Sequence, residues 1–311
     1  MKATSFHSGM HLEEDQVLPP EPECPLCLFR GKRSPVFQLQ SGPDVFLLAC
    51  PTCRGFSASR LPTSDALRVY YSQYYQQDVF HEIQNVTFHE PRRFATHVLR
   101  KAKPFLPERQ VKILDFGGGA GDLSLAIARL LLEGGASHAQ VVLVDYNASL
   151  AGARFQNIAL ECHEDLDSAR VENCDLVLAS GILEHIPHPQ TDFARLLLAL
   201  RPGGLFYART PSVAPLFRVL QRVGLPLDFT YPAHVHDMGE AYWSNILGLL
   251  PPSLRDYSII CSRPSIVETT LRRDLIRTVA AHGMKFPWRI FGSRYPFVGG
   301  WEVFIRRPIA A

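Results

Sequence analysis

The sequence lacks a strong excess of charge of either sign. Its 311 residues hold 32 lysines and arginines against 30 aspartates and glutamates, which gives a formal net charge of +2 and a pI of about 8.2. Domains that bind nucleic acids usually carry a basic field, and this composition supplies none. The composition therefore argues against nucleic acid as a partner without excluding it, and partners must be inferred from local sites.

Long hydrophobic runs are also missing. The stretch before Cys24 has no apolar core of signal-peptide length, and no run reaches the roughly 18 apolar residues of a membrane span. We therefore expect a cytoplasmic protein, a monomer or a homodimer, with no membrane partner. The first residues are polar and acidic and run into a proline-rich LPPEPE, so we expect residues 1–22 to form a flexible lead-in.

Cysteine is scarce, and an odd count of seven without an export signal argues against a disulfide framework. Four of the seven form two CxxC pairs, CPLC and CPTC, at Cys24, Cys27, Cys50 and Cys53. Each pair places two thiolates on one tight turn, and four thiolates complete a tetrahedral zinc site with no open position. The sequence thus predicts a structural Zn²⁺ in a small β module over 23–62. The other three are expected to be small core residues: Cys162, Cys174 and Cys261.

Beyond this module, apolar stretches of strand length alternate with helical patterns. Helices over 63–105 come first, and we expect them to form a connector that can close over a cofactor. Strands are expected at 111–117, 140–146, 156–161, 174–180, 203–210, 256–262 and 299–307, and helices at 122–133, 148–153, 190–201, 240–250 and 266–282. Near-continuous apolar strands between helices indicate a parallel sheet covered on both faces. The expected fold class is α/β, a doubly wound, mostly parallel seven-stranded sheet over 106–311, with a substrate-side insertion at 211–255.

The most informative stretch is ILDFGGGAGD, which joins the first expected strand to its helix. It lacks the Gly-Lys-Ser/Thr of a phosphate-binding loop, and Asp122 stands where a dinucleotide-binding turn needs its third glycine. Two flanking carboxylates, Asp115 and Asp122, also disfavour an anion at this turn. A cationic adenosine ligand without phosphate fits better, because Asp145 at the end of the next strand can accept hydrogen bonds from both ribose hydroxyls.

Four ordered blocks over about 92–215 carry a resemblance to a known family: ILDFGGGAGD, VVLVDYN, CDLVLASGILEHIPHP and LRPGGLFYARTP. They resemble the class I S-adenosylmethionine-dependent methyltransferases, which have a Rossmann-like fold. With the cysteine pairs in front, the layout is similar to bacterial members that carry an N-terminal zinc ribbon and act on small molecules or sugars. The resemblance implies a cofactor site at Asp115, Gly117, Gly119, Gly121, Asp145, Tyr146, Glu164 and Ser180.

Within that set, the resemblance implies that the glycines line the methionyl part and that Asp115 stands near its amino group. Asp145 would hold the ribose, Tyr146 would flank the adenine, and Ser180 would border the sulfonium. Glu164 or a backbone group would read the adenine edge, because Cys162 stands where an aspartate is usual. The implied methyl donor is therefore S-adenosylmethionine.

Two stretches offer catalytic candidates at the carboxyl edge of the sheet. Glu184 and His185 follow the fourth strand and can supply a base or form a structural polar network. Related metal-binding enzymes place a further glutamate where Gly181 stands, so a catalytic metal is not expected at this pair. In the insertion, the candidates are His234, His236 and Asp237.

His-x-His on an extended segment points both rings one way, so these three side chains could form a base or a metal site. A substrate-positioning or loop-capping role is the alternative. Tyr75, in the tyrosine-rich helix of the connector, could close over the cofactor on the substrate side, although an aromatic stripe can also be simple packing.

Three functions remain open from the sequence. The first is methyl transfer to a small hydroxylated, sugar-like or natural-product metabolite, assisted by a histidine base. The second is methylation of RNA, with the basic residues of the zinc module holding the strand. The third is a cofactor-binding module without catalysis that serves assembly. The acceptor atom, oxygen, nitrogen or carbon, is not encoded in these motifs.

Overall fold

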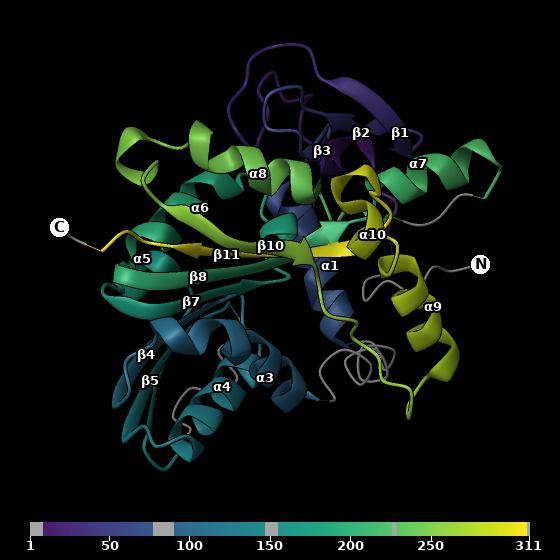
Figure 1. Ribbon diagram of the computed structural model, residues 1–311. Helices are drawn as coiled ribbons and strands as arrows, with labels where there is room; N and C mark the ends of the chain where they lie inside the picture. Colours follow the sequence, from purple (N-terminus) through teal and green to yellow (C-terminus); the bar gives the residue numbers. More distant parts are fainter. Residues whose placement is uncertain (1–8, 77–89, 147–154, 226–228, 310–311) are drawn as a thin grey trace.

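The computed structural model describes residues 9–76, 90–146, 155–225 and 229–309, in which a central sheet lies between two layers of helices (Figure 1). The sheet strands are β4 (Gln110–Phe116), β5 (His138–Val144), β6 (Ile158–His163), β7 (Cys174–Ser180), β8 (Leu200–Ser212), β10 (Ser258–Pro264) and β11 (Gly299–Arg306). Their order is β10-β11-β8-β7-β4-β5-β6, and β11 runs antiparallel to both of its neighbours. This confirms the expected doubly wound, mostly parallel seven-stranded sheet.

The switch point of the sheet lies between β4 and β7. From β4 the chain adds β5 and β6 on one side, then returns to add β7 and β8 on the other. In open α/β sheets, ligands bind outside the carboxyl ends of the strands at such a point. The residues after Phe116 and after Ser180 are therefore placed at the expected ligand edge.

Two helix layers cover the faces of the sheet, as Figure 1 shows. One layer holds α3 (Pro91–Ala102) and α4 (Asp122–Glu133), and the other holds α6 (Pro189–Leu198) and α8 (Glu240–Leu249). Successive strand residues face opposite layers, so Ile113 packs in the α3–α4 core while Leu114 packs in the α6–α8 core. This alternation explains why the strands read as continuous apolar runs.

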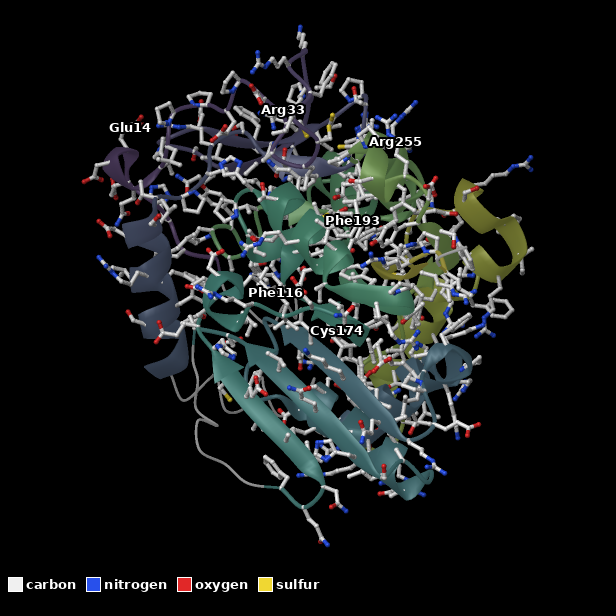
Figure 2. All side chains as sticks on the ribbon, turned by 90° about the vertical axis from the view of Figure 1, so that its left-hand side faces the viewer. Glu14, Arg33, Phe116, Cys174, Phe193 and Arg255 are labelled. Carbon is white, nitrogen blue, oxygen red and sulfur yellow. The ribbon has the colours of Figure 1, made fainter. Side chains whose placement is uncertain are left out.

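The N-terminal module has its own sheet of β1 (Ser34–Gln40), β2 (Val45–Ala49) and β3 (Phe56–Ala58). A fourth strand, β9 (His236–Asp237), comes from the insertion and pairs antiparallel with β3. The core is also shared, because Phe193 packs in the same apolar cluster as the module's cysteines. Figure 2 shows Phe193 between the module, marked by Arg33, and the sheet strand that begins at Cys174.

The expectation that residues 1–22 form a flexible lead-in is wrong for residues 9–22, which are the part of this segment that the structure describes. A short 3-10 helix, Glu14–Gln16, forms there, and Val17 makes a β bridge with Pro62. Leu12 is fully buried in an apolar cluster with Val17 and residues of the module. These two apolar side chains anchor a segment whose composition is otherwise polar, which is why composition alone suggested a loose tail.

The insertion and the C-terminal region contain helices with other bounds than expected. The loop-rich stretch after β8 contains α7 (Ala214–Arg222), and the helix expected at 266–282 begins only at α9 (Leu275–Lys285), followed by α10 (Trp288–Phe291). Asp274 explains the late start, because its side chain accepts a hydrogen bond from the Arg277 backbone N–H and caps α9. The connector contains α1 (Ser64–Gln76). The helix expected at 148–153 lies outside the described residues.

Short elements complete the chain. They are α5 (Leu166–Ala169) and the 3-10 segments Lys103–Phe105, Leu183–His185, Pro252–Leu254 and Gly292–Arg294. Across the described ranges, no helix combines the length and the hydropathy that a membrane crossing requires.

Candidate functional site

The glycine turn after β4 adopts a backbone that side chains rarely tolerate. Gly117, Gly119 and Gly121 have φ values of +68°, +55° and +69°. A Cβ on Gly117 would lie 2.3 Å from an Ile182 side-chain atom, whereas one on Gly119 would meet nothing within 4 Å. At position 117 a larger residue would clash with Ile182. At position 119 there is space for a side chain, and the positive φ alone favours glycine.

Asp115 lies directly beneath this turn. A Cβ on Gly118 would lie 2.4 Å from Asp115 Oδ2, so this glycine lets the backbone pass over the carboxylate. Asp115 is 2% exposed, and its Oδ2 has no hydrogen-bond partner among the described residues. Burial, with Asp145 nearby, raises the pKa of Asp115 to about 6. A buried carboxylate oxygen without a donor fits a site that a cationic ligand completes.

Asp145 lies at the other side of the turn, directly after β5. Its Oδ2 accepts a hydrogen bond from the Gly119 backbone N–H at 2.8 Å, which ties the open part of the turn to the next strand. Tyr146 follows it and is 57% exposed. Glu164 is exposed just beyond β6, and Ser180 is partly buried at the end of β7. The sequence-predicted cofactor residues thus line one edge of the sheet.

Helix α1 brings Tyr71 over this edge. Its ring lies 6.0 Å from that of Tyr146, and its hydroxyl lies 3.1 Å from Nδ1 of His185. Tyr71 therefore contacts both the implied adenosine side and the catalytic candidates. Tyr75 lies in the last turn of the same helix, but its side chain lies outside the described part of the structure. The lid role expected for the connector stays a prediction.

Glu184, His185 and His234 come together beyond β7. One ligand-type side-chain atom from each lies within 4.8 Å of the others, and the two histidine rings are 4.7 Å apart. Nδ1 of His185 lies 2.9 Å from the Ala233 carbonyl oxygen. Burial raises the pKa of Glu184 to about 8 and lowers the pKa of His185 to about 4. The sequence predicted all three residues, but not this grouping.

His236 and Asp237 do not join this group. His236 is fully buried in β9, and its Nε2 lies 2.9 Å from the carbonyl oxygen of Ile186. Asp237 Oδ2 accepts hydrogen bonds from the backbone N–H groups of Val213 and Ala214 at the start of α7. The structure places these two residues in docking and capping positions, and the expected facial arrangement of His234, His236 and Asp237 is absent among the described residues.

A partly buried ion pair that the sequence analysis missed borders the same region. Arg209, at the end of β8, pairs with Glu268, and its guanidinium lies over the Phe94 ring. Arg209 also lies near Glu184, because a Cβ on Gly181 would be within 4 Å of both side chains. The sequence did contain a signal for this ion pair, because an arginine inside an otherwise apolar strand needs an acidic partner.

The four patterned cysteines form a second cluster, in the N-terminal module. Sγ of Cys24 lies 3.9 Å from Sγ of Cys53, and Sγ of Cys27 lies 3.7 Å from Sγ of Cys50. Zinc–thiolate bonds of about 2.3 Å in a tetrahedron separate the sulfurs by about 3.8 Å. The cluster thus has the dimensions of a four-thiolate zinc site.

Comparison with known families gives one match along the sequence. A family model described as a methyltransferase domain matches residues 81–247, which is more than half of the chain. No curated protein matches the sequence.

Solved structures with a similar arrangement include three methyltransferases. The plantazolicin methyltransferase BpumL in complex with SAH is 14% identical, over 79% of this chain and 91% of that chain, with a TM-score of 0.47. Magnesium protoporphyrin IX methyltransferase ChlM from Synechocystis PCC 6803 with bound SAH is 12% identical, over 78% and 94%, with a TM-score of 0.45. The CurJ carbon methyltransferase is 10% identical, over 78% and 58%, with a TM-score of 0.41, so the chain spans little more than half of its length.

Proposed function

Since this chain belongs to the methyltransferase-domain family, we propose that it transfers a methyl group from S-adenosylmethionine to a small hydroxylated, sugar-like or natural-product metabolite. The observation that carries the proposal is the open glycine turn between Asp115 and Asp145 at the switch point of the sheet. S-adenosylmethionine supplies an electrophilic methyl group on a sulfonium. The chain's own residues must bind, align the reactants and allow a proton to leave the acceptor.

On the donor side, two carboxylates fit the two polar ends of the cofactor. The unpartnered Oδ2 of Asp115 accepts hydrogen bonds from the cofactor amino group, whose positive charge compensates the buried carboxylate. The Asp145 carboxylate, which already accepts a hydrogen bond from the turn, also accepts hydrogen bonds from the ribose hydroxyls. Tyr146, Glu164 and Ser180 complete the proposed binding set.

On the acceptor side, the hydroxyl group of the substrate loses its proton at the group formed by Glu184, His185 and His234. These side chains lie beyond β7, next to the turn that the methyl donor occupies. His236 is not proposed as a base, because its ring is fully buried against backbone carbonyl groups.

The zinc module has a structural role in this proposal, and its charges do not favour RNA. The four thiolates hold Zn²⁺ with no position left for a substrate. Arg33 is buried and donates to Ser57, Arg30 pairs with Glu23, and Arg60 pairs with Glu14. Since these three arginines are engaged within the module, they do not form a free basic surface for a phosphate backbone.

Calorimetric titration with S-adenosylhomocysteine tests the donor site. The wild-type protein is expected to bind one equivalent, and Asp145→Ala should weaken binding roughly 10- to 100-fold, because it removes charge-assisted hydrogen bonds to the ribose. Asp256→Asn, an exposed acid just before β10, serves as the matched control and should bind as the wild type does. No binding by folded wild-type protein, or unchanged binding by Asp145→Ala, would overturn this cofactor assignment.

The acceptor class is tested with methyl-labelled cofactor in an extract of the producing cell. Label in small metabolites supports the proposed acceptor. Label in RNA would replace it by the RNA alternative, and absence of transfer by cofactor-binding protein would favour a module without catalysis.

A further inference from the structure

We propose that Glu184, His185 and His234 bind a divalent first-row transition-metal ion on the acceptor side of the site. The proposal rests on the proposed methyl transfer and specifies how that site acts on its acceptor. Its basis is a juxtaposition that the sequence does not reveal, because 48 residues separate the second ligand from the third along the chain. One ligand-type atom from each side chain lies within 4.8 Å of the others.

Within the described part of the chain, one carboxyl oxygen of Glu184 lacks a hydrogen-bond partner, and the Arg209 charge near it is shared with another acid. The residue is 5% exposed, and its Oε2 has no hydrogen-bond partner among the described residues. The neighbouring guanidinium, that of Arg209, is already paired with Glu268. Burying a carboxylate oxygen without a donor is costly, and a bound cation removes that cost.

His185 is held in an orientation that suits a metal ligand. Nδ1 of His185 lies 2.9 Å from the Ala233 carbonyl oxygen, and a carbonyl accepts, so this nitrogen carries the proton. The ring lone pair is therefore on Nε2. Such a carbonyl partner on the remote nitrogen is the usual support of a metal-bound histidine. Ala233 directly precedes His234, whose backbone N–H donates to Thr230 at 3.1 Å.

Two imidazoles and one carboxylate leave coordination positions open, which is the pattern of metal sites that act on a substrate. Metal–ligand bonds of about 2.1 Å place neighbouring ligand atoms about 3 to 3.5 Å apart. The ligand-type atoms of this cluster lie within 4.8 Å of one another, so one ion can reach all three after small side-chain rotations. Position 181 is a glycine and supplies no ligand. His234 provides the third ligand instead, from another part of the chain.

With the ion bound, the acceptor hydroxyl coordinates in an open position, and its pKa falls. Its O–H bond breaks, and the proton passes to water, because the three side chains then act as ligands and not as the base. The acceptor oxygen then forms a bond to the methyl carbon while the carbon–sulfur bond breaks, and the electron pair of that bond stays on the sulfur. No oxidant or reductant is required.

A Mn²⁺ titration tests the proposal. Binding is monitored by the loss of the electron paramagnetic resonance signal of free Mn²⁺. The full-length protein is used with its cysteine site already loaded with zinc, and Mn²⁺ prefers oxygen and nitrogen ligands to thiolates. We expect one Mn²⁺ per chain in the wild type. His234→Ala and Glu184→Gln should each weaken binding at least about 30-fold, while His282→Ala, an exposed histidine on α9, should not change it.

Binding of S-adenosylhomocysteine is measured on the same samples. Intact S-adenosylhomocysteine binding without Mn²⁺ binding, or equal Mn²⁺ binding in wild type and His234→Ala, would overturn the metal site and leave the proposed function standing. Absence of S-adenosylhomocysteine binding in the wild type would instead overturn the proposed function. Equal thermal unfolding of the variants and the wild type shows that a weakened Mn²⁺ affinity is not caused by misfolding.

Discussion

The two ligand clusters of this protein differ in how their members are brought together. The cysteine cluster comes from two CxxC turns with the same local geometry, and the residue after each turn, Leu28 or Arg54, has a positive φ. Its sulfurs lie 3.7 and 3.9 Å apart, close to their separation around a bound zinc ion. The Glu-His-His cluster instead joins two distant segments, and a carboxylate and two imidazoles lie within 4.8 Å of one another there.

The number of ligands would give the two clusters different roles. Four thiolates fill a tetrahedral site and leave no place for a substrate, so a metal ion held there would serve the fold. Three ligands would bind an ion less strongly and keep positions open for an acceptor. The comparison therefore predicts distinct consequences for losing each site.

The largest effect is expected from Cys24→Ser, which removes a ligand of the closed site. We expect loss of the bound zinc and destabilisation by roughly 4 kcal/mol, or a fall of about 10 °C in Tm. Cys162→Ser, a partly exposed cysteine of β6 outside the cluster, is the matched control and should shift Tm by no more than about 3 °C. Thermal unfolding and elemental analysis provide the measurements. An unchanged Tm after complete zinc loss would remove the structural role.

Brief chelation should separate the two sites. The open site is expected to lose its ion first, so methyl transfer should fall on the order of 100-fold while Tm stays constant, and added Mn²⁺ should restore turnover. Activity assays and thermal unfolding on the same samples follow the two sites separately. Simultaneous loss of activity and Tm would mean that one metal, that of the cysteine cluster, accounts for both.

A smaller, pH-dependent effect is expected on the donor side, where neither metal takes part. Burial raises the pKa of Asp115 to about 6, so the carboxylate is ionised only above that pH. Affinity for S-adenosylmethionine should therefore fall as pH decreases through 6, to roughly tenfold weaker at pH 5. In Asp115→Asn, binding should be weaker at neutral pH and nearly independent of pH in this range. A wild-type affinity that stays constant from pH 7 to 5 would contradict the contact between Asp115 and the amino group.

The same raised pKa has the opposite consequence for the free protein. Because the folded-state pKa of Asp115 lies above its unfolded value, its contribution favours folding at low pH and is lost as pH rises through about 6. Asp115→Asn should therefore stabilise the protein without cofactor at neutral pH. Thermal unfolding of the unliganded variant measures this alongside the binding experiment.

The sheet was predictable because its strands are buried on both faces. Residues such as Ile113 and Leu114 face opposite helix layers, and a strand apolar on both faces is recognisable from its sequence alone. The glycine turn was recognisable for a related reason, since positive φ values at Gly117 and Gly119 restrict the residue type.

Contacts between distant segments could not be predicted in the same way. The pairing of β9 with β3 is only two residues long and carries no period-2 pattern that a sequence would reveal. It nevertheless rotates His236 towards the Ile186 carbonyl and leaves His234 facing His185. The expectation that both histidine rings point one way came from local strand geometry, which this long-range pairing overrides.

The pairing of β9 with β3 can form only late in the synthesis of the chain. Ser57 of β3 leaves the ribosome about 180 residues before its partner His236, so β3 is an unpaired edge during most of translation. Once β9 is made, the Val235 carbonyl accepts from the Ala58 N–H, and the Val235 N–H donates to the Glu184 carbonyl. This edge of the module thus stays open until β9 is made, and the same residue, Val235, then ties the edge to Glu184.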